Sequence, residues 1–157
     1  MTIASYERSG AKPTEQGVLL LRVAEEYGAL PIADLREVVR WRAFTPVPGA
    51  PPVLPGVISH RGVVLPVADL RVALGLPAAA PTRATRYVLI AYDGIDLALH
   101  VDAVLDLHVA LGEMEPPPAT LDPQRGRLIR AIFRHEDMPV ALLDLPALLN
   151  MLRGGNS

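Results

Sequence analysis

Apolar and polar positions alternate along much of this chain, and such alternation is the pattern of half-buried β-strands. The longest example runs from residue 95 to residue 111, where every odd position is apolar and the even positions include His100 and Asp102. A run of seventeen residues is longer than an ordinary strand. The pattern therefore predicts either two strands or one long, bent strand that serves two sheets.

Shorter runs of β-branched and aliphatic residues predict further strands, each bounded by turn residues. Two of the turns are Arg61-Gly62 and Asp93-Gly94, and the second is the strongest hairpin signal in the chain. A third turn is expected at Glu136-Asp137. The predicted strands span 18–24, 29–32, 39–44, 56–60, 63–67, 87–92, 127–135 and 138–143.

Helical patterns are few and short. Residues 33–38 predict one helical turn, and Asp69 predicts the N-cap of a helix over 70–74 that Gly75 ends. Asp144 predicts the cap of a C-terminal helix that stops at Gly154. The leucines of this last helix follow the spacing of a face that packs on a core: Leu145, Leu148, Leu149 and Leu152.

Two proline-rich segments connect these elements. Residues 45–55 contain five prolines, and the loop 112–123 contains three in a row at 116–118. Proline disrupts a helix interior and donates no hydrogen bond to a central ladder. We interpret 45–55 as an ordered, extended crossing loop or a sheet edge, and the alternative is a flexible linker between domains.

Two stretches of the sequence resemble each other. Leu65–Leu70 and Val140–Leu145 are each an apolar strand that runs into an Asp-Leu helix start. Each is expected to close one of two similar β-modules. About ten short strands with little helix predict an all-β fold of paired small barrels, because closure removes exposed strand edges.

Composition narrows the class of protein. The chain has 157 residues, half of them hydrophobic, which is enough for one domain or for two small ones that share a core. A net charge of −2, without a basic run and with few aromatic residues, argues against nucleic-acid binding. The absence of cysteine excludes disulfides and thiolate chemistry.

The length of the apolar runs argues against a membrane protein. No run approaches the ~18 apolar residues of a membrane span, so we expect a soluble, cytoplasmic protein without direct membrane insertion. Residues 1–15 are rich in small and polar residues and are predicted to be a disordered tail. The folded domain is then expected over residues 16–153.

Arg61 is the first candidate for a functional side chain. It stands at a turn beside Gly62, where a scaffold can hold a charge out to a partner. The alternative interpretation is a solvated turn charge, because arginines are usually exposed.

Histidine and aspartate on one side of the long alternating run form the second candidate. His100, Asp102, Asp106 and His108 are residue types that bind metals. Strand neighbours on one face lie ~6.6 Å apart, so two of them could share an ion only by leaning together, and a solvated sheet face is the simpler interpretation. The chain has no G-x-S-x-G nucleophile elbow and no Walker-type loop. We therefore expect no catalytic residue, no metal ligand and no cofactor.

Three pieces of the sequence, in order, resemble the CheW family of chemotaxis coupling proteins. Together they cover residues 18 to 152, nearly the whole predicted domain. The first piece, Tyr27–Ile32 with Leu35–Val38, is similar to the family's YALPI..V.EV, and the second, Gly56–Arg71, to GVINLRG.VLPVVDLR. The third is Leu99–Val104, similar to LLVD.V, together with Leu142–Asp144, which matches the family's closing LLD.

The resemblance implies a non-catalytic adaptor built from two intertwined five-stranded SH3-like barrels with a C-terminal helix. Family members bind the hairpin tip of a chemoreceptor in a groove between the barrels. They also bind the regulatory domain of a CheA-type histidine kinase through barrel ends, and other CheW-like domains are further partners that the resemblance allows. Such an adaptor couples chemoreceptors to the kinase in a signalling array. By motif position, the receptor-contacting residues are Leu35, Glu37, Gly56, Arg61 and Gly62.

The sequence departs from the family pattern next to Arg61. Ser59-His60 stand in place of Asn-Leu, so an imidazole replaces a branched apolar contact, and Gly28 stands in place of the aromatic residue of YALPI. One alternative function is a CheW-like regulator of a pathway that controls surface motility or another output. The others are a ligand-binding barrel lined by Val and Leu, although small barrels are normally filled by their own side chains, and a metal-dependent enzyme that uses His100 and Asp102.

Overall fold

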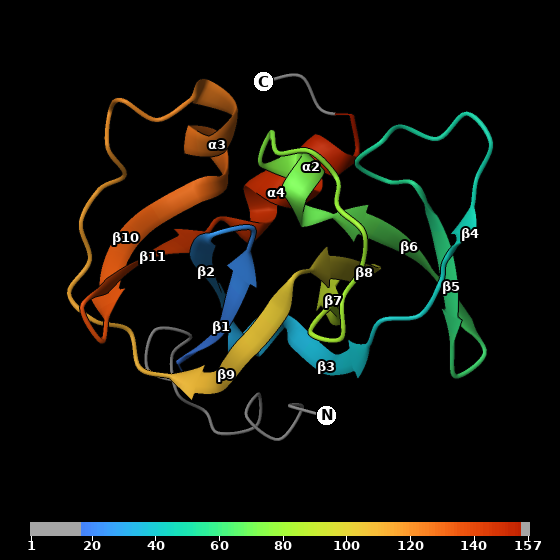
Figure 1. Ribbon diagram of the computed structural model, residues 1–157, viewed down its shortest axis with the longest axis horizontal. Coiled ribbons are helices and arrows are strands. Elements are labelled where there is room, and N and C mark those ends of the chain that lie inside the picture. Colours follow the sequence, from blue (N-terminus) through green and yellow to red (C-terminus); the bar gives the residue numbers. More distant parts are fainter. Residues whose placement is uncertain (1–16, 155–157) are drawn as a thin grey trace.

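Two β-sheets lie side by side in this protein (Figure 1). The computed structural model describes residues 17–154. The first sheet has five strands in the order β10-β11-β2-β1-β9. Its strands are β1 (Val18–Val23), β2 (Glu26–Pro31), β9 (Ala103–Val109), β10 (Ile129–His135) and β11 (Met138–Leu143). We call this sheet with its loops and helix α3 the five-stranded module.

The second sheet has six strands in the order β3-β7-β8-β6-β5-β4. Its strands are β3 (Leu35–Arg40), β4 (Thr45–Pro46), β5 (Gly56–His60), β6 (Val63–Asp69), β7 (Arg86–Tyr92) and β8 (Ile95–Val101). We call it the six-stranded module. Five strands were expected, and the sixth is the two-residue β4, which pairs with β5 at the edge of the sheet.

The chain passes from the first sheet to the second and back, so the modules are intertwined. It builds β1 and β2, crosses over to build β3 to β8, and returns at β9. The long alternating run is therefore two strands, β8 and β9, which belong to different sheets. The all-β class and the paired modules of the sequence analysis are confirmed.

Both modules contain the same strand-and-helix unit, at the two stretches that resemble each other in the sequence. In the six-stranded module β6 pairs in parallel with β8 and leads into α2 (Leu70–Ala73). In the five-stranded module β11 pairs in parallel with β2 and leads into α4 (Leu145–Leu152). Asp69 and Asp144 cap these helices by accepting hydrogen bonds from backbone N–H groups of the first turn.

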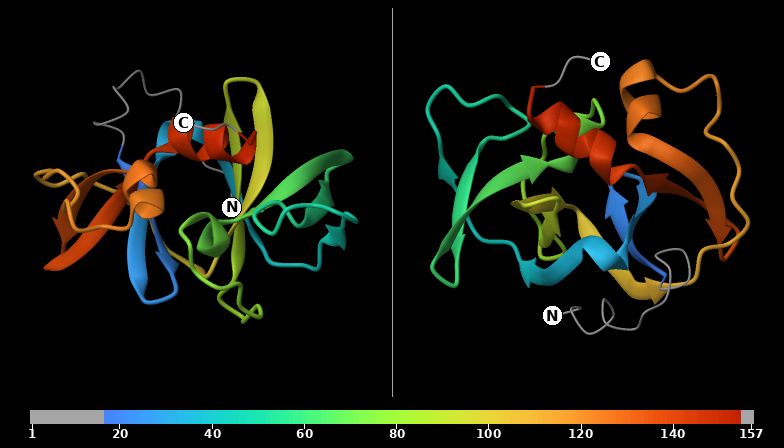
Figure 2. Two further views of the ribbon diagram at one scale, coloured as in Figure 1. Left: turned by 90° about the horizontal axis from the view of Figure 1, so that it is seen from above. Right: turned by 180° about the vertical axis from the view of Figure 1, so that it is seen from behind.

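The core has three parts. One apolar cluster lies within the five-stranded module around Phe133, and one lies within the six-stranded module around Tyr87. The largest cluster joins both modules and includes Leu21, Leu99 and the buried face of α4. Figure 2 shows α4 lying along the seam between the two sheets. Since the largest core belongs to neither module alone, the two modules form one folded unit.

The proline-rich segment 45–55 is ordered and is not a linker. Val47 N–H donates to Pro55 C=O, and Asp69 N–H at the end of β6 donates to Val53 C=O at 2.9 Å. Val53 and Leu54 also pack against the central core. This segment is therefore an extended connection with a short edge strand, as we expected.

Three sequence predictions about local structure are wrong. The strand predicted over 39–44 lies earlier in the chain, as β3 (Leu35–Arg40), and residues 41–44 form neither helix nor strand. The predicted helical turn at 33–38 is only the 3-10 turn Ile32–Asp34, because Leu35 already begins β3. The predicted strand 127–135 begins at Ile129, because Pro123–Leu128 forms α3 with Asp122 as its N-cap. The Asp-Pro start of this helix follows the usual rule for an N-cap and first helical position.

The predicted tail, residues 1–15, lies outside the described residues. Among the helices of residues 17–154, none combines the length and the apolar character that crossing a bilayer requires.

Candidate functional site

The β5–β6 hairpin carries Arg61 at its tip, at the lower right of Figure 1. His60 pairs with Val63, so only Arg61 and Gly62 form the loop. Their φ angles are 50° and 80°, which are the left-handed values that a two-residue turn between twisted strands requires. Gly62 adopts this conformation freely, whereas Arg61 does so against its preference. The turn thereby projects Arg61, whose side chain is 71% exposed.

Glu37 on β3 holds the guanidinium group of Arg61. Its Oε1 lies 3.1 Å from Arg61 Nη1, and its Oε2 accepts a hydrogen bond from Arg61 Nη2 at 3.2 Å. His60 Nε2 lies 3.1 Å from the same Oε1. The Glu37 side chain is only 12% exposed. This nearly buried carboxylate therefore holds the exposed guanidinium group of Arg61 and fixes its orientation.

The contact between Glu37 and the hairpin shows that the six-stranded sheet curls. In that sheet β3 and β5 are separated by three strands, β7, β8 and β6. A flat sheet would hold them ~19 Å apart, because four strand spacings of ~4.8 Å separate them. The direct contacts of Glu37 with His60 and Arg61 therefore require strong curvature, as in a small barrel.

A groove of about 260 Å³ opens beside this ion pair. Its charged and polar lining includes Arg36, Glu37, His60, Arg61 and Asp96. Apolar side chains from the three strands β6, β7 and β8 complete it: Val63, Leu65, Leu89, Ile90 and Leu97. The groove thus offers apolar contact area with a few charges in fixed positions.

The structure brings three of the five predicted receptor-contacting residues together at this groove. Glu37 and Arg61 form the ion pair, and Gly62 makes the turn that presents it. Leu35 is fully buried in the central core, so its side chain supports β3 and has no surface to offer a partner. Gly56 is also buried, and a Cβ there would lie 2.2 Å from the carbonyl oxygen of Thr45. Gly56 therefore permits the close approach of β4.

Exposed valines beside the turn are part of the site that the sequence analysis did not single out. Val63 and Val64 expose about half or more of their surface, which is unusual for such residues on a paired strand. Their position directly after Arg61-Gly62 was the signal that could have identified them. Val63 extends the apolar surface of the groove, whereas Val64 does not line it and lies on the other face of β6.

The second candidate, the histidine and aspartate of the alternating run, is structural. His100 is only 8% exposed, so the predicted solvated face is wrong at this position. The reason is that β8 lies between β7 and β6 and is covered on both sides. Burial lowers the pKa of the His100 imidazole, and the nearby carboxylates of Asp69 and Asp102 oppose this shift only in part. Among the side chains that the structure describes, which do not include that of His108, no group of three or more potential metal ligands occurs.

Asp102 joins the two modules. It lies at the bend between β8 and β9 and accepts from Arg71 Nε at 2.8 Å and from the backbone N–H of Ala24. Arg71 belongs to α2 of the six-stranded module, and Ala24 belongs to the β1–β2 turn of the five-stranded module. The carboxylate is therefore occupied by structural donors.

Comparison with known proteins shows which family this chain resembles. The model of the CheW-like domain family matches residues 17–153. The chemotaxis protein CheW of Bacillus subtilis is 33% identical over 140 residues, which is 88% of this chain and 89% of that protein. CheW of Rhizobium meliloti is 33% identical over 131 residues (82% and 83%), and protein FrzA of Myxococcus xanthus is 31% identical over 123 residues (78% and 76%).

A solved structure matches as well. The scaffolding protein TtCheW from Thermoanaerobacter tengcongensis superimposes with a TM-score of 0.72 at 27% identity, covering 83% of this chain and 89% of that one. The match extends over both modules, so it concerns the whole fold. This chain therefore belongs to the CheW family of chemotaxis proteins and is a non-catalytic adaptor that couples chemoreceptors to a CheA-type histidine kinase.

Proposed function

We propose that the groove beside the Glu37–Arg61 ion pair binds the hairpin tip of a chemoreceptor. The observation that carries this proposal is the bidentate contact between an almost buried carboxylate and an exposed arginine at a two-residue turn. A solvated turn charge does not need such an anchor. The anchor reduces the freedom that Arg61 would lose on binding, which is the advantage of a pre-organised contact.

The shape and chemistry of the groove suit a helical hairpin. Leu65, Leu89 and Leu97 line its floor but are almost fully buried, so the half-exposed Val63 offers the main apolar surface. Charges at the margin of such a contact set its register and orientation more than its strength. Arg61 is then the specificity contact, and Val63 supplies apolar contact beside it.

The kinase's regulatory domain is proposed to bind elsewhere. The five-stranded module exposes Leu105 on β9 and Met114 in the following loop, each by about 45%. These side chains lie outside the groove and offer apolar surface at the end of the other module. An adaptor needs two separate surfaces to hold two partners at once, and this arrangement provides them in a cytoplasmic protein beneath the receptor array.

Binding of purified receptor tips to Arg61→Ala tests the first surface. We expect receptor affinity to fall about tenfold, equivalent to ~1.4 kcal/mol, because the variant loses the register contact. Unfolding stability should change by less than about 1 kcal/mol, because an exposed ion pair contributes little. Binding of the kinase regulatory domain should stay unchanged.

Arg127→Ala is the matched control, since Arg127 is an exposed arginine on α3 outside the groove. It should retain both partners. A large loss of stability in Arg61→Ala with receptor affinity intact would assign this arginine to the fold and overturn the proposal.

A further inference from the structure

A second pocket with a different chemistry lies on the six-stranded module. It has a volume of about 440 Å³ and is lined by Arg40, Trp41, Thr82, Arg83, Thr85 and Arg86. We call it the arginine pocket. It shares no lining residue with the groove beside Glu37 and Arg61.

Two of its arginines face each other without an acidic partner. Arg40 on β3 and Arg86 on β7 are directly opposed in the antiparallel register, and like charges in this position destabilise a sheet. Within residues 17–154 no carboxylate forms an ion pair with Arg40, Arg83 or Arg86. The fold therefore tolerates a concentration of positive charge that it does not neutralise itself.

The pocket is held in shape by hydrogen bonds of its backbone. Arg86 Nη1 donates to the carbonyl oxygens of Arg83 and Thr85, at 2.8 and 2.9 Å. Thr85 Oγ1 accepts from the N–H of Thr82 at 2.8 Å, and Trp41 N–H donates to Thr85 C=O. These contacts fix the loop 82–85 against the end of β3, so the cationic side chains surround a preformed hollow.

Trp41 also lines a second, mostly apolar pocket. It has a volume of about 190 Å³, and Trp41 lines both pockets. Apart from Asp69 and His100, its remaining lining is apolar: Phe44, Pro52, Pro55, Val67, Ala78, Ala79 and Pro81. A ligand that fills both pockets must therefore carry negative charge next to an apolar group.

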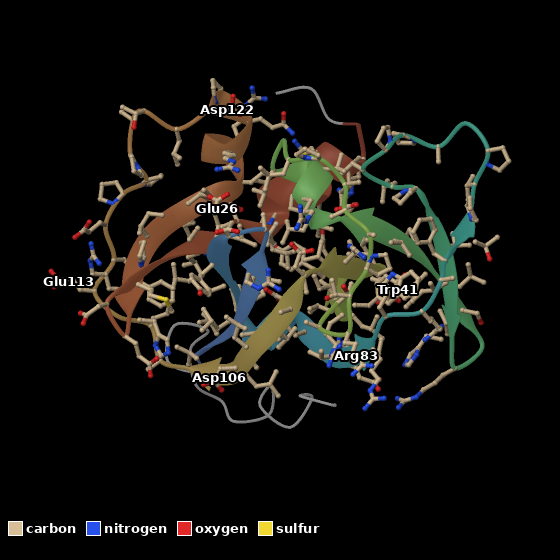
Figure 3. All side chains as sticks on the ribbon, viewed as in Figure 1. Glu26, Trp41, Arg83, Asp106, Glu113 and Asp122 are labelled. Atoms are coloured by element: carbon tan, nitrogen blue, oxygen red, sulfur yellow. The ribbon has the colours of Figure 1, made fainter. Side chains whose placement is uncertain are left out.

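Charge is also segregated between the modules. Residues 35–101 carry seven arginines and four acidic residues, whereas residues 17–34 and 102–154 together carry six arginines and eleven acidic residues. Figure 3 labels Trp41 and Arg83 on the six-stranded module and the acids Glu26, Asp106, Glu113 and Asp122 on the other. The six-stranded module thus carries a net positive charge, which favours anionic partners.

We propose that the arginine pocket and the adjoining apolar pocket form a docking site for an acidic peptide segment of a partner protein, one with carboxylates next to a bulky aliphatic side chain. Guanidinium groups match carboxylates in a bidentate geometry, and the apolar pocket receives the aliphatic group. The partner class follows from charge complementarity and from the apolar hollow, which an inorganic anion would leave empty. The site is separate from the groove proposed for the receptor.

Tryptophan fluorescence provides a direct test, because Trp41 is the single tryptophan in the sequence. The full chain is titrated with a synthetic, end-blocked peptide of four glutamates around one leucine. We expect a saturable change of Trp41 emission that weakens as salt is raised. Arg40→Gln and Arg83→Gln should each weaken binding roughly five- to tenfold, whereas Arg127→Gln and Arg61→Ala should bind the peptide as the unchanged chain does.

Three results would overturn the proposal. A peptide with glutamine at each glutamate position could change the emission equally, which would remove the role of charge. Inorganic phosphate at the same concentration could produce the same change and displace the peptide, which would make the pocket a simple anion site. Sedimentation could show that the chain self-associates through Arg40 and Arg83 and that the peptide does not compete, which would make a second copy the occupant.

Discussion

Gly56 belongs to the family motif, and its role in this structure is to allow close packing of buried backbone. Alanine there would place a Cβ 2.2 Å from Thr45 O and 2.5 Å from the ring of Phe44. The first contact is with backbone, which cannot rotate away, so β4 must move. We expect Gly56→Ala to lower the free energy of unfolding by about 1 to 3 kcal/mol, the usual cost of overpacking, as measured by urea denaturation.

Gly126 is the matched control for this substitution. It lies in α3, its φ is negative, and a Cβ there meets nothing within 4 Å. Gly126→Ala should therefore leave stability unchanged or raise it by up to ~1 kcal/mol, because alanine favours a helix. If Gly56→Ala were equally harmless, the close approach of β4 to β5 would not depend on this glycine.

His100 gives the protein a pH-dependent stability. Its pKa is lowered from the ordinary value of 6.5, chiefly by burial. In the unfolded chain this histidine binds a proton as the pH falls through 6.5, whereas in the folded chain it stays neutral, so the free energy of unfolding decreases on acidification. Above 6.5 both states are neutral and the contribution is constant.

Urea unfolding over a pH series, with His100→Gln as the variant, measures this contribution. The unchanged chain should lose stability below pH 6.5, and His100→Gln should lose less over the same interval. A slope in His100→Gln identical to that of the unchanged chain would show that His100 does not titrate differently on folding.

At the residue scale, the sequence predicted positions better than it predicted contacts. Arg61 was correctly placed at a turn because Arg-Gly between two apolar runs is a local signal. Its contact with Glu37 is 24 residues away in sequence and depends on the curl of the sheet, which no local pattern contains. For the same reason Leu35 and Gly56 were expected at the contact surface, although neighbours distant in sequence cover them.

At the scale of elements, α4 is the helix that joins the modules. Leu145, Leu148 and Leu149 are buried in the central core, and the exposed Asn150 lies on the opposite side. Leu148 is 1% exposed, so Leu148→Ala should cost about 2 to 5 kcal/mol of unfolding free energy. Chemical denaturation followed by circular dichroism measures the change.

Asn150→Ala serves as the control on the same helix. Its side chain faces solvent, and alanine has the higher helix propensity, so stability should not fall. A neutral result for Leu148→Ala would mean that α4 does not hold the seam and is free for a partner.

Elements with strong periodicity could be predicted from the sequence, and elements that begin inside a proline-rich segment could not. The face of α4 was evident because four leucines repeat at helical spacing. Helix α3 was missed because it has only six residues, too few to show a period, and follows a stretch of prolines. Its single cue was Asp122-Pro123, an N-cap and first-position pair, and Gly126 within the helix weakened that cue.

At the scale of the whole molecule, the crossing of the chain couples the two modules. The five-stranded sheet is built from both ends of the described chain, with the entire six-stranded sheet between them. The largest apolar cluster draws side chains from both sheets and from α2 and α4. We therefore expect the protein to unfold in one cooperative transition. Binding at the groove should then stabilise the other module as well. The alternation over residues 95–111 indicated a segment that serves two sheets. The shared core could not be inferred from the sequence, because it depends on β8 and β9 lying in different sheets.

Asp102 is the polar link at this crossing, and its substitution tests the coupling. In Asp102→Asn one acceptor oxygen becomes an N–H₂ group that cannot accept from Arg71 Nε, and the negative charge that pairs with Arg71 is lost. Since both partners of the Arg71–Asp102 pair are largely buried, the variant should lose roughly 2 to 4 kcal/mol. Scanning calorimetry should show a lower midpoint and still one transition, because the apolar core continues to join the modules. Asp106→Asn, on the exposed part of β9, is the control and should not change the midpoint of thermal unfolding. Two separate transitions in either variant would show that the modules fold independently.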